Sequence, residues 1–295
     1  MFKSGFVSVV GRPNVGKSTL VNALVGSKVS IVTYKPQTTR DVIRGVYNDE
    51  DSQIIFTDTP GIHKSEDELG NIMNLNASNA TSGCEVILMV VDISKESNAS
   101  DKYVIERIKD LGCPIILVLN KIDTKAKIEL LPIISHYASL EVFKEIIPIS
   151  ALNETNLQEL IKVIKSYLPE GPRYYPVTMV SDHPQTFSIS ETVREKIFLN
   201  LSDELPYSIG VYTEEVNDSD DKLKARVIVL VSRDSQKGII IGEKGTMLKK
   251  ISKQARDDLA KQLNKQVVLD IYVRVQKNWR NSPSILKMLG YSIDD

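Results

Sequence analysis

The chain has 295 residues, of which 42% are hydrophobic and 25% are charged, a composition that is ordinary for a globular protein and excludes a disordered or fibrous one. Its net charge of −1 is unevenly distributed, because residues 232–280 hold twelve Lys/Arg and five Asp/Glu and the rest carries −8. Two distant cysteines, with no Cys-x-x-Cys or His-rich cluster, argue against a structural metal site, and no apolar stretch nears the ~18 residues of a membrane span. We therefore expect two domains in a reducing cytoplasm, with a C-terminal segment that attracts a polyanion.

The first 168 residues alternate between strand-like and helix-like segments. Strands are expected at 5–11, 42–48, 52–59, 85–92, 114–121 and 145–151. Helices are expected at 17–25, 71–81, 101–111, 125–140 and 156–168. Apolar strands separated by amphipathic helices predict an α/β fold, with a doubly wound, mostly parallel sheet that helices cover on both faces. Ligands of such sheets bind at the carboxyl ends of the strands.

The pattern changes at residue 169. Residues 169–176, PEGPRYYP, contain three prolines and a glycine and predict a linker. Residues 177–295 are expected to form a smaller α+β domain. Its expected elements are a strand and then a helix within 183–201, strands at 207–216 and 222–232, a short apolar strand at 238–241, a polar helix that ends near Leu263, and a strand at 266–276.

Residues 11–18 follow the first expected strand and open the first expected helix with the pattern G-x-x-x-x-G-K-S. Such a loop closes its backbone N–H groups around phosphate oxygens, and the start of the helix adds partial positive charge. Lys17 is expected to contact the β- and γ-phosphates of a nucleotide, and the Ser18 hydroxyl to bind Mg²⁺. The residues expected to line this phosphate site are Gly11, Asn14, Val15, Gly16, Lys17, Ser18 and Thr19.

Two further segments are expected near the γ-phosphate. Asp58 begins the sequence DTPG at a strand end, where its carboxylate can hold Mg²⁺ through water and the N–H of Gly61 can sense the γ-phosphate. Thr38 and Thr39 lie in the polar loop KPQTTRD, and one of them can complete the metal site; we favour Thr39. The expected metal ligands are therefore Ser18, Thr39 and Asp58.

Recognition of a base is expected from the sequence NKID at residues 120–123, which ends another strand. The Asp123 carboxylate can accept hydrogen bonds from N1–H and the 2-amino group of guanine, whereas adenine offers neither donor there. Asn120 and Lys121 belong to the same motif. The sequence Ser150-Ala151-Leu152 closes the last strand, where a backbone N–H can meet the guanine O6.

These motifs, in this order at successive strand ends, resemble the five-motif G domain of the Ras-like GTPases over residues 1–168. The resemblance implies GTP hydrolysis, with Lys17, Thr39, Gly61 and Asn14 as the catalytic residues. This chain differs from Ras-like proteins at one catalytic position. Ras-like proteins place a glutamine after the glycine of DTPG to orient the attacking water, whereas this chain has Ile62. Slow intrinsic hydrolysis is therefore expected. Asn14 matches a position at which several such GTPases bind K⁺, and this ion can replace an arginine finger electrostatically.

The segment GIIIGEKGTMLKKI, residues 238–251, carries a second glycine turn. It lacks the spacer and the closing Lys-Ser/Thr pair of a phosphate-binding loop, and Glu243 would repel a phosphate, so a second nucleotide site is not expected. Its Gly-x-x-Gly spacing resembles the loop of a KH domain, which joins two helices and clamps about four nucleotides of a single strand. The segment order fits the type II KH domain, whose helix precedes its strands. The expected RNA-binding residues are Ile241, Gly242, Glu243, Lys244, Gly245, Lys249, Lys250 and Lys253.

Taken together, GRPNVGKSTLVNAL, PQTTRD, DTPGIH, NKID and SAL, followed by ETVREKIFLNLSDELPYSIGV and IIGEKGTMLKKI, resemble the Era family of bacterial GTPases over nearly the whole chain. The resemblance implies a GTP- and Mg²⁺-dependent switch that binds 16S ribosomal RNA near its 3′ end and assists assembly of the small ribosomal subunit. We expect a cytoplasmic monomer, with a peripheral contact at the inner face of the membrane as an option. Two alternatives stay open: an RNA-binding nucleotide sensor with negligible hydrolysis, and a GTPase whose second domain binds protein or a membrane surface.

Overall fold

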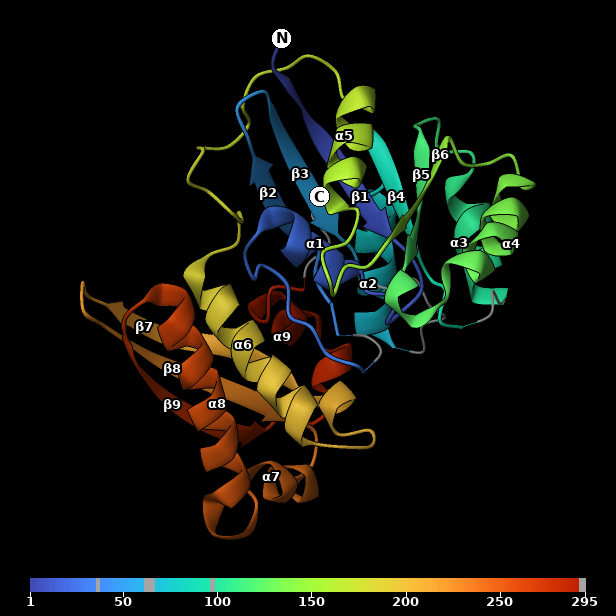
Figure 1. Ribbon diagram of the computed structural model, residues 1–295. Coiled ribbons are helices and arrows are strands. Elements are labelled where there is room, and N and C mark those ends of the chain that lie inside the picture. Colours follow the sequence, from blue (N-terminus) through green and yellow to red (C-terminus); the bar gives the residue numbers. More distant parts are fainter. Residues whose placement is uncertain (36–37, 61–66, 96–98, 292–295) are drawn as a thin grey trace. The chain divides into compact units, whose positions relative to one another are not determined.

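The computed structural model of the protein describes residues 1–35, 38–60, 67–95 and 99–291 (Figure 1). These residues separate into two compact units, with the main break between Asp182 and His183. Each unit has its own sheet and its own hydrophobic core. Among the helices of the described residues, none combines the length and hydrophobicity needed to cross a bilayer.

The first unit is built on a six-stranded sheet, as counted over the described residues, with the order β2-β3-β1-β4-β5-β6. The strands are β1 (Lys3–Val10), β2 (Ile43–Asn48), β3 (Ser52–Asp58), β4 (Val86–Asp92), β5 (Ile115–Asn120) and β6 (Glu145–Ile149). Only the β2–β3 pair is antiparallel among these pairings. The register places Asp58 opposite Val9 and Asp92 opposite Asn120, so the polar residues that end these strands gather at one edge.

Helices cover both faces of this sheet, which confirms the predicted α/β fold. They are α1 (Lys17–Val25), α3 (Ala99–Ile108), α4 (Lys127–Ala138) and α5 (Leu157–Tyr167), while α2 (Glu68–Asn79) lies between β3 and β4 in the chain. Apolar side chains of α1 and α5 pack on one face, and those of α3 and α4 pack on the other. Because each fully buried aliphatic side chain contributes about 1.5–3 kcal/mol, these two layers hold the strand ends firmly in place.

Residues 169–182 run along the first unit, with which they group. Their backbone pairs with the outer strand β2 through an antiparallel bridge between Gly45 and Ser181. The buried side chain of Gln53 accepts hydrogen bonds from the backbone N–H groups of Tyr174 (2.6 Å) and Tyr175 (2.9 Å), and donates to the carbonyl of Tyr175 (2.8 Å). The segment predicted as a linker is therefore fastened to the sheet and covers the free edge of β2.

The second unit contains a three-stranded sheet of the order β7-β8-β9 within its described residues, with β7 antiparallel and β9 parallel to β8. Its elements are α6 (Gln185–Asn200), β7 (Gly210–Asp218), β8 (Lys222–Val231), α7 (Asp234–Ile241), α8 (Thr246–Leu263), β9 (Gln266–Val275) and α9 (Pro283–Met288). Helices α6 and α8 cover one face of the sheet and share its core (Figure 1). This helix-first order is that of the predicted type II KH domain.

Two local predictions for the second unit are wrong. The strand expected at the start of 183–201 is absent, because Pro184 caps α6 and the helix begins at Gln185. The strand expected at 238–241 is the end of α7, whose start is fixed when the Gln236 side chain accepts hydrogen bonds from the N–H groups of Ser232 and Arg233. Local capping and tertiary packing thus outweigh the strand preference of three consecutive isoleucines.

Candidate nucleotide site and RNA interface

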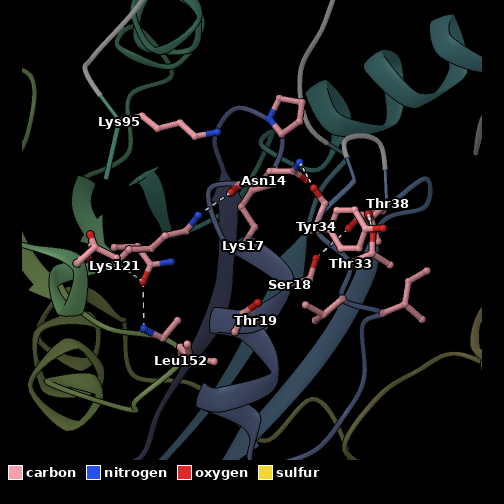
Figure 2. A pocket seen from close by; sticks show the side chains of 18 of the residues that line it. Asn14, Lys17, Ser18, Thr19, Thr33, Tyr34, Thr38, Lys95, Lys121 and Leu152 are labelled. Carbon is pink, nitrogen blue, oxygen red and sulfur yellow. Dashed lines mark hydrogen bonds between the residues drawn. The ribbon is translucent and has the colours of Figure 1, made fainter. Parts of the chain in front are cut away.

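A cavity of about 620 Å³ lies at the polar edge of the first sheet (Figure 2). Residues from five separate segments line it: the loop before α1 with the first turn of that helix, the segment after α1, Lys95 after β4, the end of β5 with the residues that follow it, and the loop after β6. The lining residues are Pro13, Asn14, Gly16, Lys17, Ser18, Thr19, Ile31, Val32, Thr33, Tyr34, Thr38, Thr39, Lys95, Asn120, Lys121, Asp123, Thr124, Ala151 and Leu152. The structure thus brings together most of the predicted nucleotide-site residues.

Lys17 provides the positive charge at the base of this cavity. Its ammonium donates to the carbonyl oxygens of Gly11 (3.1 Å) and Arg12 (3.2 Å), which curls the loop around the lysine. Burial lowers the pKa of Lys17 from 10.5 to about 8, and the charge of Asp58 opposes this effect. A buried ammonium that donates to two carbonyl oxygens, with a carboxylate nearby, is suited to bind a polyanion, because the phosphates would supply further negative charge.

Ser18, Thr39 and Asp58 meet beside Lys17. The Ser18 hydroxyl lies 2.9 Å from the Thr39 hydroxyl, which lies 3.5 Å from Asp58 Oδ2. Asp58 is fully buried, and its Oδ1 has no hydrogen-bond partner within the described part of the chain. Burial raises the pKa of the Asp58 carboxyl, while the Lys17 ammonium and nearby hydroxyls act against this rise. Two hydroxyls and a carboxylate with an unpaired oxygen are hard oxygen donors that fit a hydrated Mg²⁺ ion.

The two threonines of this loop have different neighbours. The Thr38 hydroxyl lies 2.6 Å from the Thr33 hydroxyl and donates to the carbonyl of Lys35 at 2.7 Å, so it stabilises the loop itself. Thr39 is the threonine beside Ser18 and Asp58. The loop is also joined to the phosphate-binding segment, because the Asn14 amide donates to the Tyr34 carbonyl at 2.8 Å (Figure 2).

The opposite end of the cavity is arranged for a base. Asn120 donates to the Val15 carbonyl (2.8 Å) and accepts from the Ala151 N–H (3.0 Å), which ties three of the segments together. Ser150 donates to Asp123 Oδ1 at 2.5 Å and so fixes the orientation of that carboxylate. Asp123 keeps its second oxygen for a ligand that presents N–H donors, as guanine does.

Two buried carboxylates, Asp92 and Asp101, form ion pairs with residues of the site and were not predicted from the sequence. Asp92 forms a 2.6 Å ion pair with Lys121, whose ammonium also donates to the Asn14 carbonyl at 3.2 Å. Although burial acts to raise it, the hydrogen bonds from Lys121 and Ser94 hold the pKa of Asp92 below its ordinary value. Asp101 on α3 forms a 3.1 Å ion pair with Arg12 of the phosphate loop. The available signal for Asp92 was its place at the end of an apolar strand, the same signal that identified Asp58.

Two of the predicted features cannot be placed. Gly61, expected to sense the γ-phosphate, and Ile62, expected in place of a catalytic glutamine, lie outside the described residues. Leu152 lines the cavity mouth and is 76% exposed, so it is available to cover a bound ligand.

The second glycine turn joins α7 to α8, as expected for a Gly-x-x-Gly loop. Gly242 has a φ of +73°, and a Cβ there would lie 2.7 Å from the Cβ of Met247. Gly245 has a φ of +77°, but a Cβ there would meet nothing within 4 Å. The two glycines thus differ: Gly242 is required by the fold of the turn, whereas the space beside Gly245 is open to a nucleic-acid backbone.

Exposed cations surround this turn. Lys244 lies in the turn, and Lys249, Lys250 and Lys253 follow on α8; all four side chains are exposed. The isoleucines before the turn differ in exposure: Ile240 is fully buried in the core, whereas Ile239 is 56% exposed. An exposed apolar side chain, a glycine turn and four lysines form the kind of surface that holds a single strand by its backbone and bases.

The fold and the cavity define a P-loop GTPase joined to a KH-type RNA-binding unit. Residues 6–121 match the family described as 50S ribosome-binding GTPase, and residues 204–280 match the KH domain family. The crystal structure of a single-residue variant of Aquifex aeolicus Era bound to GDP and AlF4⁻ is 40% identical, with a TM-score of 0.96, over 99% of this chain and 100% of that chain. The chain belongs to the Era family of GTPases.

A second solved structure gives the same result. Era in complex with MgGDPNP and nucleotides 1506–1542 of 16S ribosomal RNA is also 40% identical, with a TM-score of 0.96, and covers the same shares of both chains. The resemblance stated from the sequence motifs is thereby confirmed, as are the two fold types predicted for the chain.

Proposed function

We propose that the protein is a GTP-hydrolysing switch that binds the 3′ end of 16S ribosomal RNA through its KH unit and assists assembly of the small ribosomal subunit. One observation carries this proposal: side chains from separate motifs converge on one cavity, in a chain whose second unit carries a glycine turn between two helices. The relative solved with nucleotides 1506–1542 of 16S ribosomal RNA supports the RNA partner. For the choice of RNA, this solved relative is more informative than the description of the matching GTPase family. The relative covers the KH unit, whereas the family match covers only residues 6–121.

The nucleotide would be held at both ends of the cavity. Lys17 and the N–H groups of the phosphate loop would neutralise the phosphates, and Asp123 would read the guanine edge. Ser18, Thr39 and Asp58 would hold Mg²⁺, which supplies a Lewis acid for phosphoryl transfer when bound. Loss of the γ-phosphate would free the segment around Thr39, as in other GTPase switches.

The RNA would be held mainly by its backbone at the glycine turn. Lys244, Lys249, Lys250 and Lys253 would contact phosphates, and Ile239 and Ile241 would offer an apolar surface to the bases. Because these contacts are largely ionic, the affinity should fall steeply with salt concentration. If the two units respond to one another, RNA and GTP must each change the affinity of the other by the same factor.

Turnover of GTP with and without RNA tests the enzymatic part. We expect slow multiple-turnover hydrolysis that changes when a fragment of the 16S 3′ end is added. Hydrolysis that is absent in both conditions, together with retained RNA binding, would instead support a nucleotide sensor.

A single substitution in the glycine turn tests the RNA interface. Gly245→Asp places a negative charge in the open space of the turn, at a φ of +77° that strains any side chain, so RNA binding should be lost while GDP affinity is unchanged. Gly238→Asp controls for the added charge, since Gly238 lies on α7 and its Cβ would also meet nothing within 4 Å, and the melting temperature of Gly245→Asp controls for the strain. Equal RNA binding by both variants would contradict RNA binding at this turn, and binding to anionic vesicles in place of RNA would favour a membrane contact.

Potassium is proposed as an electrostatic aid to hydrolysis. Asn14 lies in the phosphate loop, and its amide nitrogen donates to the Tyr34 carbonyl. The side-chain oxygen of Asn14 and the Tyr34 carbonyl are the kinds of oxygen that suit a monovalent cation beside the phosphates. Hydrolysis should be faster in KCl than in NaCl, and Asn14→Ala should remove the difference; equal rates for the unmodified protein in both salts would contradict this role.

We also propose that the protein acts in the cytoplasm as a monomer. Cys84 and Cys113 are free thiols 3.9 Å apart, which suits a reducing compartment. Sedimentation of the nucleotide-bound protein should give a single species near 33.0 kDa.

A further inference from the structure

The two cysteines of the chain, which are distant in sequence, meet at the amino edge of the first sheet. Cys84 precedes β4 and Cys113 precedes β5, and these strands are parallel neighbours. Their Sγ atoms lie 3.9 Å apart, although the residues are 29 positions apart in the chain. Both are free thiols, and neither belongs to a motif of the nucleotide site or of the glycine turn. Two adjacent thiols can exchange as a unit with a disulfide from solution.

The strand geometry brings the two backbones close enough for a disulfide. The N–H of Ile87 donates to the Pro114 carbonyl at 3.0 Å, so the pairing of β4 with β5 continues to the residue after Cys113. Extended by two residues, the register places Cys113 opposite Glu85, the neighbour of Cys84. Because strands lie about 4.8 Å apart and rise about 3.3 Å per residue, residues offset by one position have Cα atoms about 6 Å apart. This separation is within the range of about 4.4–6.8 Å that disulfides usually span.

Both thiols are accessible from one side and packed on the other. They are half-buried at the edge of the core layer that α3 and α4 cover. Each follows an exposed glycine, Gly83 or Gly112, where a Cβ would meet nothing within 4 Å. The Cys84 thiol donates to the Thr81 carbonyl at 3.4 Å, which fixes its orientation. A small disulfide molecule therefore has room to approach, while the core keeps the two sulfur atoms together.

The two cysteines are expected to react in a fixed order. Burial, and then the charge of Cys113, raise the pKa of Cys84 to about 12, so Cys84 remains a thiol at neutral pH. Because the thiolate is the attacking form, the first attack on an outside disulfide is assigned to Cys113. Once Cys113 is part of a mixed disulfide it carries no charge, so its effect on the pKa of Cys84 is removed.

We propose that Cys84 and Cys113 form a thiol–disulfide exchange site, which closes into an intramolecular disulfide with a low-molecular-weight disulfide, such as oxidised glutathione, as the oxidant. The Cys113 thiolate attacks one sulfur of the oxidant, which forms a mixed disulfide and releases one thiol. The Cys84 sulfur then attacks the Cys113 sulfur, which forms the intramolecular bond and releases the second thiol. The protein loses two electrons and two protons, and the two released thiols carry both.

The new bond would join the starts of β4 and β5, whereas the nucleotide cavity lies at their carboxyl ends. Seven residues of β4 separate the two edges, a distance of about 20 Å. Oxidation would therefore stabilise the first unit and leave nucleotide binding intact.

Equilibration of the full-length protein with mixtures of reduced and oxidised glutathione tests this site. We expect the loss of both titratable thiols, a mass lower by two hydrogen atoms, and a peptide in which Cys84 is linked to Cys113. Because a disulfide restricts the unfolded chain, the melting temperature of the oxidised protein should rise by about 5 °C, with unchanged GDP affinity.

The two single variants serve as matched controls. Cys84→Ser should stop at the mixed disulfide with glutathione and show no rise in melting temperature. Cys113→Ser should react with oxidised glutathione at least about tenfold more slowly than Cys84→Ser, because its remaining thiol is the one with the raised pKa.

Several results would overturn the proposal. Thiols that stay titratable, or glutathione adducts that persist on both cysteines of the unmodified protein, would show that the two sulfur atoms cannot be joined in the fold. Disulfides found only between two chains would exclude an intramolecular site. An unchanged or lower melting temperature of the oxidised protein, or a loss of GDP affinity, would show that the bond forms only by distorting the fold. Equal rates for the two single variants would overturn the order of attack.

Discussion

Asp123→Asn changes the hydrogen-bonding pattern at the guanine end of the cavity while keeping the size of the side chain. In the unmodified protein, Ser150 holds one carboxylate oxygen at 2.5 Å and the carboxylate faces the bound base with acceptors only. Asparagine keeps one acceptor but points an amide N–H₂ at the 2-amino group of guanine. One hydrogen bond to a charged group, worth about 1.5–3 kcal/mol, is lost, and a donor then faces a donor. We expect a loss of about 3 kcal/mol or more, which is at least about a hundredfold in Kd.

The same variant should gain affinity for xanthine nucleotides, because xanthine carries a carbonyl oxygen where guanine carries the amino group. Competition against a fluorescent nucleotide, with GDP and XDP in turn, measures both affinities. Asp110→Asn makes the same chemical change at an exposed residue and serves as the control. If Asp123→Asn binds GDP as tightly as the unmodified protein and does not prefer XDP, Asp123 does not read the base and the assignment of this end of the cavity is wrong.

Three further predictions concern charge and packing. Burial lowers the pKa of Lys17 to about 8, and bound phosphates would keep Lys17 protonated, so GDP binding takes up a proton as the pH rises. The affinity for GDP should therefore fall about tenfold between pH 7 and pH 9. A pH-independent Kd would contradict this. Asp92→Asn removes the ion pair of Lys121 and should weaken GTP and GDP binding by the same factor, about tenfold, as measured by titration. Unequal factors would show that Asp92 and Lys121 do not act only at the guanine end of the cavity. Gln53→Ala leaves the backbone of residues 174–175 without partners and should speed proteolysis of residues 169–182 while costing about 3 kcal/mol in denaturant unfolding; Gln158→Ala, at an exposed glutamine, should do neither.

The parts of the site that could be predicted from sequence are those encoded by local pattern. Period and apolar content located the strands of the first unit, and polar residues directly after a strand identified Asp58 and Asn120. The position of these residues at one sheet edge followed from parallel strand order alone. The glycine turn was found in the same way, because Gly-x-x-Gly spacing in a basic segment is visible without a fold.

The parts that were missed depend on contacts between distant residues. Cys84 contacts Cys113 before the neighbouring strand, and Asp92 reaches Lys121 on the neighbouring strand end. Neither contact can be predicted from residue spacing or composition. Residues 169–176 have the composition of a linker, but the buried amide of Gln53 fixes them along the sheet. Three isoleucines predicted a strand at 238–241, and capping of α7 by Gln236 reverses that preference.

The central claim is that the nucleotide in the first unit governs RNA binding by the second. The most direct measurement is the affinity of the protein for a 16S 3′-end fragment, first with GDPNP and Mg²⁺ and then with GDP and Mg²⁺, at one salt concentration. Since reciprocal coupling is typically about 5–150-fold, we expect the GDPNP-bound protein to bind the fragment at least about fivefold more tightly. Equal affinities in the two nucleotide states, with both nucleotides shown to be bound, would contradict the account.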